Sequence, residues 1–327
     1  MAYFGAAGTT EKEVQQALFI TTERGYFSQV AQTINQGLLK KNIHSANGFW
    51  ADQDTFFLSQ FRHTIEQDYQ GQIAALNFNK QEESSSIINE WTKNQTEGKI
   101  EKLLEPDDLK SGMRLLLTNA IYFQGSWALG FNPSKSRSLP FKKSASESVP
   151  VMMMHQDAAY PYYEDDQLQV ISLPISGGKI AALFFLPKTD SFLNLLFTAS
   201  TFEEYLSKME EKSIQVVLPK FSLRQRFYLK EGLEALGIKE AFSEKANFSL
   251  VDGMRDLYLD QVIHEALFSI DETGVLATGA TNASLGLTSM PKETTSLLFL
   301  ADHPFICMLI DLDSRIPLFI AEVQNPS

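Results

Sequence analysis

Cysteine is nearly absent from the sequence, which has Cys307 as its only copy. An internal disulfide and a zinc site built from cysteines are therefore excluded. Because Cys307 lies in the apolar run 305–310, we expect it to be a small buried side chain and not a nucleophile. Glycine and proline are also scarce, at 18 and 12 of 327 residues, which excludes collagen-like and broadly disordered proteins.

Positive charge is in deficit as well. Lys and Arg number 28 against 40 Asp and Glu, giving a formal net charge of −12. Binding to nucleic acid needs an excess or a clear stripe of basic residues, so we expect no nucleic-acid partner. No charge-free apolar stretch reaches the ~18 residues of a membrane span, so we expect no membrane partner. Residues 1–5 show neither a basic leader nor a long apolar segment, so no signal peptide is visible.

The chain does have enough length and apolar content for a large core. With 44% hydrophobic residues, it could form one large domain or two ordinary ones. Repeats and long linker-like runs are missing, which predicts one continuous domain over 1–327. In the first third, apolar residues recur three and four apart and predict helices over 11–20, 27–39 and 56–69. Ser84–Ser86 is expected to cap a further helix that contains 87–91 and closes at Gly98.

From Met113 onward, long apolar runs rich in strand-forming residues predict strands. They cover residues 115–123, 169–173, 180–186, 214–218, 257–270, 296–312 and 317–323. A short helix over 229–236 is expected to end at Gly237. Since strands dominate the second half, the pattern favours an α+β fold over alternating βαβ units.

Residues 273–290 form eighteen consecutive positions without a charge, twelve of them Gly, Ala, Thr or Ser. As a strand, this segment would place Val275, Ala277, Gly279, Thr281 and Ala283 on one face. It has no proline before Pro291 and no charge to block pairing, so it is competent to join an open sheet edge. A flexible exposed hairpin loop explains the composition equally well.

A search for catalytic motifs finds little. The sequence has no nucleophile elbow, no metalloprotease helix motif and no phosphate-binding loop. The five histidines are scattered without ligand spacing, so we expect no metal. His264 lies in a strand pattern, where a satisfied buried histidine is the default and a base for a serine nucleophile is a distant second. We therefore expect no enzyme activity and no cofactor.

Several segments, in order along the chain, resemble the serpin family. These are Asn89-Glu90-Trp91 with Thr96 to Ile100, Thr118 to Trp127 followed by Phe131, Val149 to Met153, Leu218-Pro219-Lys220-Phe221, Leu236-Gly237-Ile238 with Phe242, Asp302-His303-Pro304-Phe305, Pro317 to Ile320, and Asn325-Pro326. Together they span nearly the whole chain. The resemblance implies a serpin-like α+β fold with three β-sheets, about nine helices and an exposed reactive loop over about 272–295.

The resemblance also implies an activity. Serpins typically inhibit serine proteases, or cysteine proteases, as suicide substrates: the protease cleaves the reactive loop, forms an acyl-enzyme and is trapped when the loop inserts into the central sheet. The implied hinge residues are Glu272, Gly274, Val275, Ala277, Gly279 and Ala280. Asn119 and His264 resemble the polar pair at the point where the sheet opens, and Trp127 resembles the aromatic residue at the entry of the loop. A role in core packing and hydrogen bonding explains these three equally well.

The position of the scissile bond has two solutions. Counting forward from Gly274 at the family's spacing implies the bond Thr288–Ser289, with Leu287–Thr288 as its neighbour. Counting back from Pro304 instead leads to Lys292–Thr294. We favour the forward count, because the inserted length decides where the protease ends up. A small or medium apolar residue before the cut suits elastase-, chymotrypsin- or subtilisin-like proteases, whereas a cut at Lys292 would suit trypsin-like ones.

Two departures from the family's pattern leave rival functions open. Val275 and Leu276 stand where inhibitors more often have Thr or Ser and then Glu. Residues 1–5 resemble the end of an early helix, so we expect the usual first helix and a neighbouring strand to be absent. The alternatives are a non-inhibitory serpin, acting as substrate, carrier or chaperone, and, remotely, a hydrolase. By resemblance we expect a monomer outside the cell; with no signal peptide visible, an intracellular location stays open.

Overall fold

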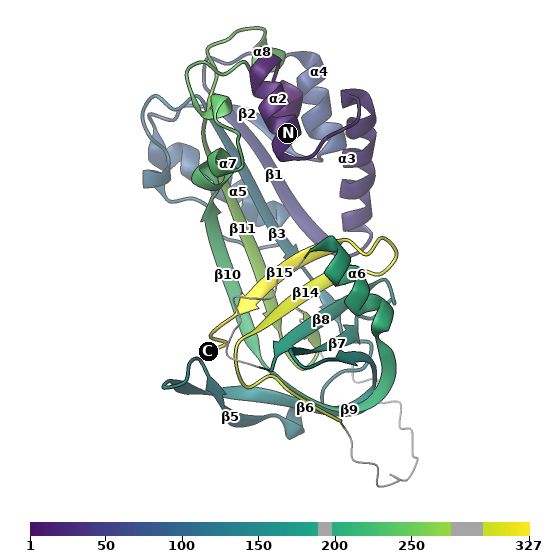
Figure 1. Ribbon diagram of the computed structural model, residues 1–327. Coiled ribbons are helices and arrows are strands. Elements are labelled where there is room, and N and C mark those ends of the chain that lie inside the picture. The colour runs from purple at the N-terminus through teal and green to yellow at the C-terminus, as the bar shows by residue number, and fades with distance from the viewer. Residues whose placement is uncertain (189–197, 276–296) are drawn as a thin grey trace. The chain divides into compact units, whose positions relative to one another are not determined.

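The computed structural model describes residues 1–188, 198–275 and 297–327 (Figure 1). It divides into two compact units, each built from two stretches of sequence. Unit 1 is Met1–Phe123 with Arg224–Leu267, and unit 2 is Gln124–Leu223 with Phe268–Ser327. The expectation of a single domain over 1–327 stays a prediction.

Unit 1 contains a sheet whose strands run in the order β2-β1-β3-β11, with β10 beside β11. The strands are β1 (Ile43–Asp52), β2 (Gln72–Leu76), β3 (Leu115–Phe123), β10 (Phe221–Tyr228) and β11 (Leu259–Ile270). β1 is antiparallel to β3, but β3 and β11 are parallel neighbours. Figure 1 shows β1, β3 and β11 side by side. We call the paired stretches 115–122 of β3 and 259–267 of β11 the β3–β11 seam.

The helices of unit 1 cover this sheet and complete its core. They are α1 (Ala2–Gly5), α2 (Gly8–Ala17), α3 (Arg24–Leu39), α4 (Ser59–His63), α5 (Gln81–Gln95), α7 (Lys230–Ala235) and α8 (Ser249–Asp252), with single turns at Thr64–Asp68, Pro106–Asp108 and Glu240–Phe242. One buried cluster joins Phe4, Phe49 and Phe248. α5 packs on β1 through Trp91 and Trp50, whose rings meet edge to face at 5.3 Å.

In unit 2, eight strands form one network in the order β13-β9-β6-β7-β8-β14-β15, with β5 beside β6. They are β5 (Arg137–Lys142), β6 (Ser148–Glu164), β7 (Leu168–Pro174), β8 (Ile180–Pro187), β9 (Glu210–Pro219), β13 (Leu297–Leu300), β14 (Phe305–Asp311) and β15 (Pro317–Val323). β6 pairs with β5 over 148–153, with β9 over 153–162 and with β7 over 162–164. The resemblance implies three β-sheets. Because this 17-residue strand is continuous, the described residues form two hydrogen-bonded sheets instead.

The remaining elements of unit 2 are short. They are β4 (Gly125–Ser126), β12 (Gly274–Val275), α6 (Ala199–Lys208) and a 3-10 turn at Pro133–Lys135. With eight α-helices across the described residues and extended sheets in both units, the expected serpin-like α+β class is confirmed.

The core of unit 2 is densest along β8 and β14. Every residue of β8 is buried, and Phe184 lies opposite Cys307 of β14. Cys307 has no exposed surface, and burial raises the pKa of its thiol well above the ordinary value. A thiol that stays protonated is a poor nucleophile, so Cys307 is the small buried side chain that its apolar run predicts.

Several predicted element boundaries are wrong, and two of them have a clear physical reason. Ser84–Ser86 do not cap α5, because the helix already begins at Gln81, where Glu82 and Glu83 lie in the first turn and favour the positive end of the helix. The strand expected over 296–312 is two strands, since the chain is interrupted between Leu300 and Phe305, where Pro304 lacks a backbone N–H.

Candidate functional site

The chain reverses direction where β11 ends. β11 finishes at Ile270, residues 271–273 turn, and β12 returns antiparallel with Val275 opposite Ile270. β12 pairs on its other side with Gly125 and Ser126 of β4. We call residues 271–275 the hinge turn. It holds three of the predicted hinge residues, Glu272, Gly274 and Val275, and Val275 is fully buried.

The side chain of Asp271 stabilises this turn by accepting hydrogen bonds from its backbone. Its Oδ1 accepts hydrogen bonds from the backbone N–H groups of Thr273 at 2.7 Å and Gly274 at 3.1 Å. A side chain that bonds the backbone two and three residues ahead fixes a tight reversal. Gly274 has a φ of 153°, and a Cβ added there would lie 2.1 Å from the carbonyl oxygen of Gly125. Only glycine fits this position without displacing β4.

Glu272 anchors the turn to the rest of unit 2. Its side chain is 8% exposed; the carboxylate accepts a hydrogen bond from Ser136 Oγ at 2.7 Å and pairs with Lys220 Nζ at 2.8 Å. Burial alone would favour the neutral acid, but the hydrogen bonds from Lys220 and Ser136 outweigh it and hold the pKa of Glu272 below its ordinary value. Glu272 is therefore a charged anchor at neutral pH.

Trp127 holds the backbone of the same turn. Its indole Nε1–H donates to the carbonyl oxygen of Asp271 at 2.8 Å, and its backbone N–H donates to that of Thr273 at 2.9 Å. The backbone N–H of Phe131 donates to the carbonyl oxygen of Glu272 at 2.9 Å. The hinge turn is thus fixed by hydrogen bonds along its length.

Asn119 and His264 meet across the β3–β11 seam in unit 1. They are register partners, and His264 Nδ1 lies 2.7 Å from Asn119 Oδ1. The amide nitrogen of Asn119 donates to Ser45 Oγ at 3.1 Å and to Asn47 Oδ1 at 2.8 Å. Asn119 Oδ1 is therefore the acceptor for His264, so Nδ1 of His264 carries the proton. Burial lowers the pKa of His264, although Glu265 partly opposes this. The ring is consequently neutral near pH 7.

The other predicted site residues lie outside the described part of the chain. They are Ala277, Gly279, Ala280, Leu287, Thr288 and Ser289, all within 276–296. The described chain enters this segment at β12 and leaves it at β13, and both strands belong to unit 2. The scissile bond and a reactive loop over about 272–295 stay predictions.

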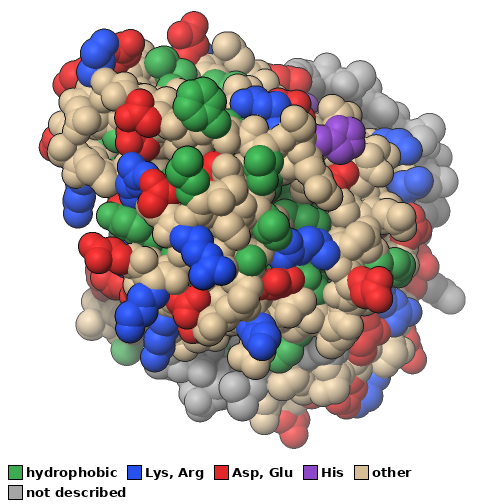
Figure 2. All heavy atoms as spheres, turned by 90° about the horizontal axis from the view of Figure 1, so that it is seen from above, with side chains coloured by type: hydrophobic (Ala, Val, Ile, Leu, Met, Phe, Trp, Pro, Cys, Tyr) green, Lys and Arg blue, Asp and Glu red, His purple; other side chains and the backbone are tan. Residues whose placement is uncertain are grey.

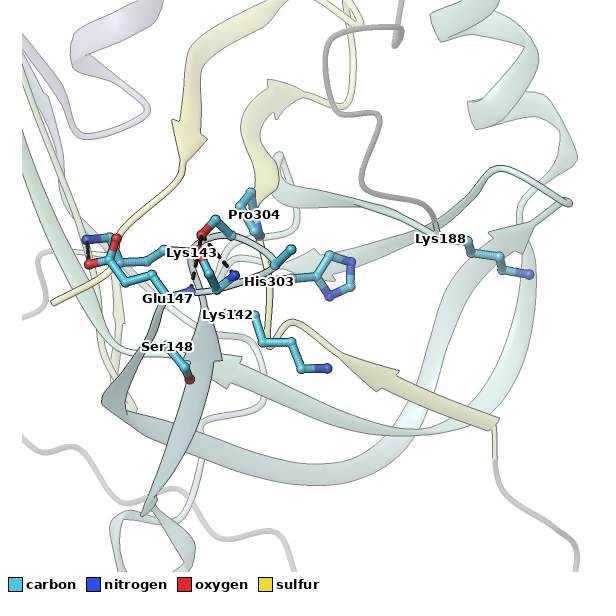
Figure 3. A pocket seen from close by; sticks show the side chains of 10 residues that line it. Lys142, Lys143, Glu147, Ser148, Lys188, His303 and Pro304 are labelled. Atoms are coloured by element: carbon cyan, nitrogen blue, oxygen red, sulfur yellow. Dashed lines mark hydrogen bonds and ion pairs between the residues drawn. The ribbon is translucent and has the colours of Figure 1, made fainter.

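A second candidate site is a pocket of about 810 Å³ in unit 2 (Figure 3). Its lining includes Lys142, Lys143 and Lys188, which suggests an anion. Each lysine, however, already has a carboxylate partner: Asp302 at 3.5 Å, Glu147 at 2.5 Å and Glu164 at 2.9 Å respectively. Because these partners compensate its positive charge, we assign no ligand to the pocket.

Charges of both signs are mixed on the surface drawn in Figure 2. On the face drawn in Figure 2, basic and acidic side chains lie interspersed with hydrophobic ones, and its described residues show no basic stripe. Within residues 1–188, 198–275 and 297–327, no cluster of His, Cys, Asp and Glu could hold a metal ion. The helices described there include none with the length and apolarity to cross a membrane.

Sequence reasoning missed the partners that hold the predicted residues in place. Lys220 entered only as part of a motif, and Ser136, Asp271 and Asn47 were not singled out. A buried Glu in a turn implies a nearby cation, which is the one signal that could have pointed to Lys220. The partners themselves lie 136 residues from Glu272 for Ser136 and 72 residues from Asn119 for Asn47, so no local pattern connects them.

Known proteins agree with this architecture. The model of the serpin (serine protease inhibitor) family matches residues 1–326. Human serpin B9 is 31% identical, covering 100% of this chain and 89% of that protein. The leukocyte elastase inhibitor of Sus scrofa is 30% identical with the same coverage. The crystal structure of Serpin48 from Tenebrio molitor superposes with a TM-score of 0.89 at 26% identity, covering 100% of this chain and 88% of the other. The chain belongs to the serpin family.

Proposed function

We propose that this serpin inhibits a serine protease as a suicide substrate. The observation that carries the proposal is the parallel pairing of β3 with β11, followed at once by a chain reversal at the hinge turn. A strand that continues from Val275 runs antiparallel to β11. It would therefore also be antiparallel to β3, and could enter the seam with ladder hydrogen bonds on both sides.

The register of the hinge turn sets where each residue would go. Val275 lies opposite Ile270, so each step forward along the loop moves one step back along β11. Ala277 would then face Phe268, Gly279 would face Ala266 and Thr281 would face His264. These side chains are small, so the seam could admit them without overpacking. The hydroxyl of Thr281 would arrive between Asn119 and His264 and could replace part of their hydrogen bond.

The chemistry belongs to the protease. Its catalytic serine attacks the carbonyl carbon of Thr288, the bond from Thr288 to Ser289 breaks, and the amine of Ser289 leaves with a proton. The ester between Thr288 and the protease serine then moves with the loop as it inserts. Displacing the oxyanion hole by ~1 Å can cost ~100-fold in rate, so deacylation stalls. The uncleaved state is kinetically trapped, because its central sheet lacks the strand that the loop supplies.

The proposal extends to the target and the organisation of the protein. Thr288 before the cut suits elastase-, chymotrypsin- or subtilisin-like pockets. A relative named leukocyte elastase inhibitor supports the first of these. We take residues 1–327 as one serpin domain that acts as a monomer, and the family resemblance favours a target outside the cell.

Incubation with elastase, subtilisin and trypsin tests the proposal. We expect a covalent complex with elastase or subtilisin that survives boiling in SDS, and release of the fragment 289–327 by mass spectrometry. Ala277→Arg would place a charge beside buried Phe268 and should convert trapping into plain cleavage. Thr295→Arg, which lies beyond the proposed cut, is the matched control and should still trap. Cleavage of the wild type without a complex, but with a large rise in melting temperature, would instead favour the substrate-like alternative.

A further inference from the structure

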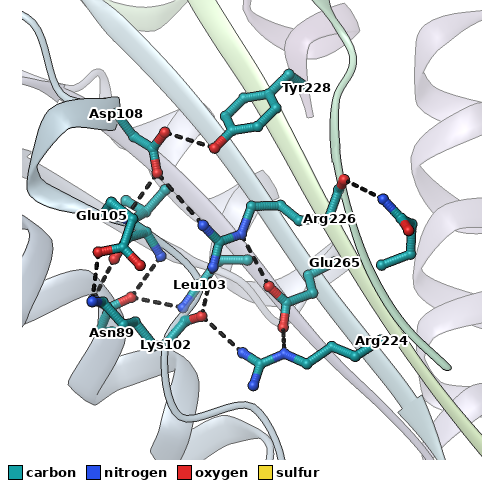
Figure 4. A network of polar contacts seen from close by, with 11 residues as sticks. Asn89, Lys102, Leu103, Glu105, Asp108, Arg224, Arg226, Tyr228 and Glu265 are labelled. Carbon is teal, nitrogen blue, oxygen red and sulfur yellow. Dashed lines mark hydrogen bonds and ion pairs between the residues drawn. The ribbon is translucent and has the colours of Figure 1, made fainter. Parts of the chain in front are cut away.

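The face of the seam opposite His264 carries a charged cluster built around one buried carboxylate (Figure 4). Glu265 of β11 is 1% exposed. Its two carboxylate oxygens accept hydrogen bonds from the Nε–H groups of Arg224 at 2.6 Å and Arg226 at 3.2 Å. The Nη2 groups of both arginines donate to one backbone carbonyl, that of Lys102, each at 2.8 Å. Glu265 thus orients two guanidinium groups toward the same acceptor.

A second contact lies beside the first. Tyr228 Oη donates to Asp108 Oδ1 at 2.7 Å, and Arg226 Nη1 lies 3.7 Å from Asp108 Oδ2. The hydrogen bond to Asp108 raises the pKa of Tyr228, so its hydroxyl stays protonated and able to donate at neutral pH. We call this set the clasp: Lys102, Asp108, Arg224, Arg226, Tyr228 and Glu265.

The two sides of the clasp belong to opposite sides of the seam. The arginines and Tyr228 lie on β10 and Glu265 on β11, and these two strands pair with each other. Lys102 and Asp108 lie in the segment that connects α5 to β3. Asn89 of α5 holds that segment, accepting from the backbone N–H groups of Leu103 and Leu104 at 2.8 Å each. α5 in turn packs on β1. The clasp therefore fastens the β1–β3 side to the β10–β11 side.

Opening the seam has to break these bonds. An inserted strand would increase the separation of β3 and β11 from one strand spacing, about 4.8 Å, to two. The hydrogen bonds to Lys102 and Asp108 cannot stretch over that change. The same register that places Thr281 opposite His264 would place Ala280 opposite Glu265, on the face of the sheet where the clasp lies. The hydrogen bond between Asn119 and His264 breaks on the other face at the same time.

We propose that the clasp sets the rate at which the β3–β11 seam admits a strand, with Glu265 as the positioning residue that aims both arginines at Lys102. The proposal rests on the proposed function, since the same seam receives the cleaved loop. A tight clasp preserves the uncleaved state against spontaneous insertion. A looser one lets the loop enter sooner, before the acyl-enzyme is hydrolysed. The clasp thereby influences which fraction of the protease is trapped and which fraction escapes by hydrolysis of the acyl-enzyme.

The test follows the entry of a synthetic peptide with the sequence of residues 274–287 into the uncleaved protein, measured as a native-gel shift and a gain in melting temperature. Glu265→Gln keeps the shape but weakens the hold on both arginines. We expect entry about tenfold faster, equivalent to about 1.4 kcal/mol in the barrier. Glu11→Gln is the matched control, because it neutralises a carboxylate paired with Arg24 at 2.6 Å away from the seam. It should leave the rate unchanged.

Tyr228→Phe supplies a second measurement that leaves no buried charge behind. It removes one hydrogen bond across the seam, and we expect entry about threefold faster, because the Asp108 carboxylate that it leaves still lies 3.7 Å from Arg226 Nη1. Equal rates in the wild type, Glu265→Gln and Tyr228→Phe would overturn the clasp while leaving insertion intact. If the peptide never enters the wild type, insertion itself is absent. The proposed function then fails together with the clasp.

Discussion

The β3–β11 seam of unit 1 and the β8–β14 pair of unit 2 are both neighbouring strands in a sheet, but only the seam has polar side chains midway along its strands. β8 and β14 are antiparallel and almost entirely apolar, and all of β8 is buried. The seam is parallel, with Asn119 and His264 on one face and Glu265 on the other. Separating β8 from β14 would expose apolar surface at about 25 cal/mol per Å². Opening the seam exchanges hydrogen bonds that an incoming strand can remake.

The contrast indicates how a protein can contain a sheet that opens without falling apart. Polar side chains in the middle of a strand pair lose little free energy when an incoming strand replaces their partners, whereas a wholly apolar pair has no substitute for burial. Four substitutions probe the apolar pair, the hinge turn and the seam, with expected effects that decrease in that order.

Phe184→Ala should damage the apolar pair most. The ring is fully buried between neighbouring strands, so its loss should lower the free energy of unfolding by about 3–5 kcal/mol. Chemical denaturation measures this. Phe227→Ala, at a ring of β10 that is 43% exposed, is the control and should cost far less. Equal losses would erase the difference between the two regions.

Gly274→Ala should disrupt the hinge turn, because its new Cβ would collide with the carbonyl oxygen of Gly125. We expect a loss of about 1–3 kcal/mol, typical of a side chain forced into a backbone conformation reserved for glycine. Limited proteolysis near the turn should accelerate. Gly130→Ala, whose added Cβ would sit at an ordinary 3.5 Å from the carbonyl oxygen of Glu272, should behave like the wild type; if both variants do, the turn is not sterically fixed.

Glu272→Gln should remove a charged anchor that depends on pH. The pKa of Glu272 is held below its ordinary value, so its contribution is complete above about pH 4.5 and is lost as the pH falls through the lowered pKa. We expect the variant to lose about 1–2 kcal/mol at pH 7 and to converge with the wild type in acid. Thermal unfolding from pH 7 to pH 3 measures the difference. A constant gap at every pH would contradict a role for the charge.

His264→Gln should have the smallest effect, and its pH dependence should appear at higher pH than that of Glu272→Gln. The pKa of His264 is lowered by burial from its ordinary value of 6.5, so the unfolded chain takes up a proton before the folded one does. Stability is then lost as the pH falls below about 6.5. We expect the wild type to weaken slightly in this range and the glutamine variant to lack that component. Parallel pH curves for the two proteins would exclude His264 as its source.

The sequence allows the apolar elements and the family to be predicted, because both depend on local pattern. β3 and β8 appear as long runs of strand formers, and Gly237 ends α7 with a φ of 103° as a helix cap should. β1 was missed since Asn47 and Gly48 interrupt its apolar residues. β6 was missed because Pro150 and Pro161 argue against a continuous strand, yet it pairs along its whole length.

The candidate site divides along the same line. Asn119, Trp127 and His264 were found through motifs, and so was the pairing of Asn119 with His264. Their other partners, Ser45, Asn47 and Asp271, were not. The clasp joins Arg224 and Arg226 to Glu265 and Lys102 through contacts that span 39 to 124 residues of sequence. Nothing at short range relates them until β10 and β11 pair. The alternation of Arg224, Arg226 and Tyr228 along one strand, facing a lone Glu in an apolar strand, is the pattern that could have suggested it.

The single buried cysteine can report how often the core around it opens. Cys307 lies in the β8–β14 pair, and its thiol can meet a reagent only when that core opens. Since the chain has no other thiol, the rate of labelling counts openings of this one region without any engineered probe. Comparing that rate before and after cleavage of the proposed reactive loop would test whether cleavage also makes the β8–β14 pair open less often.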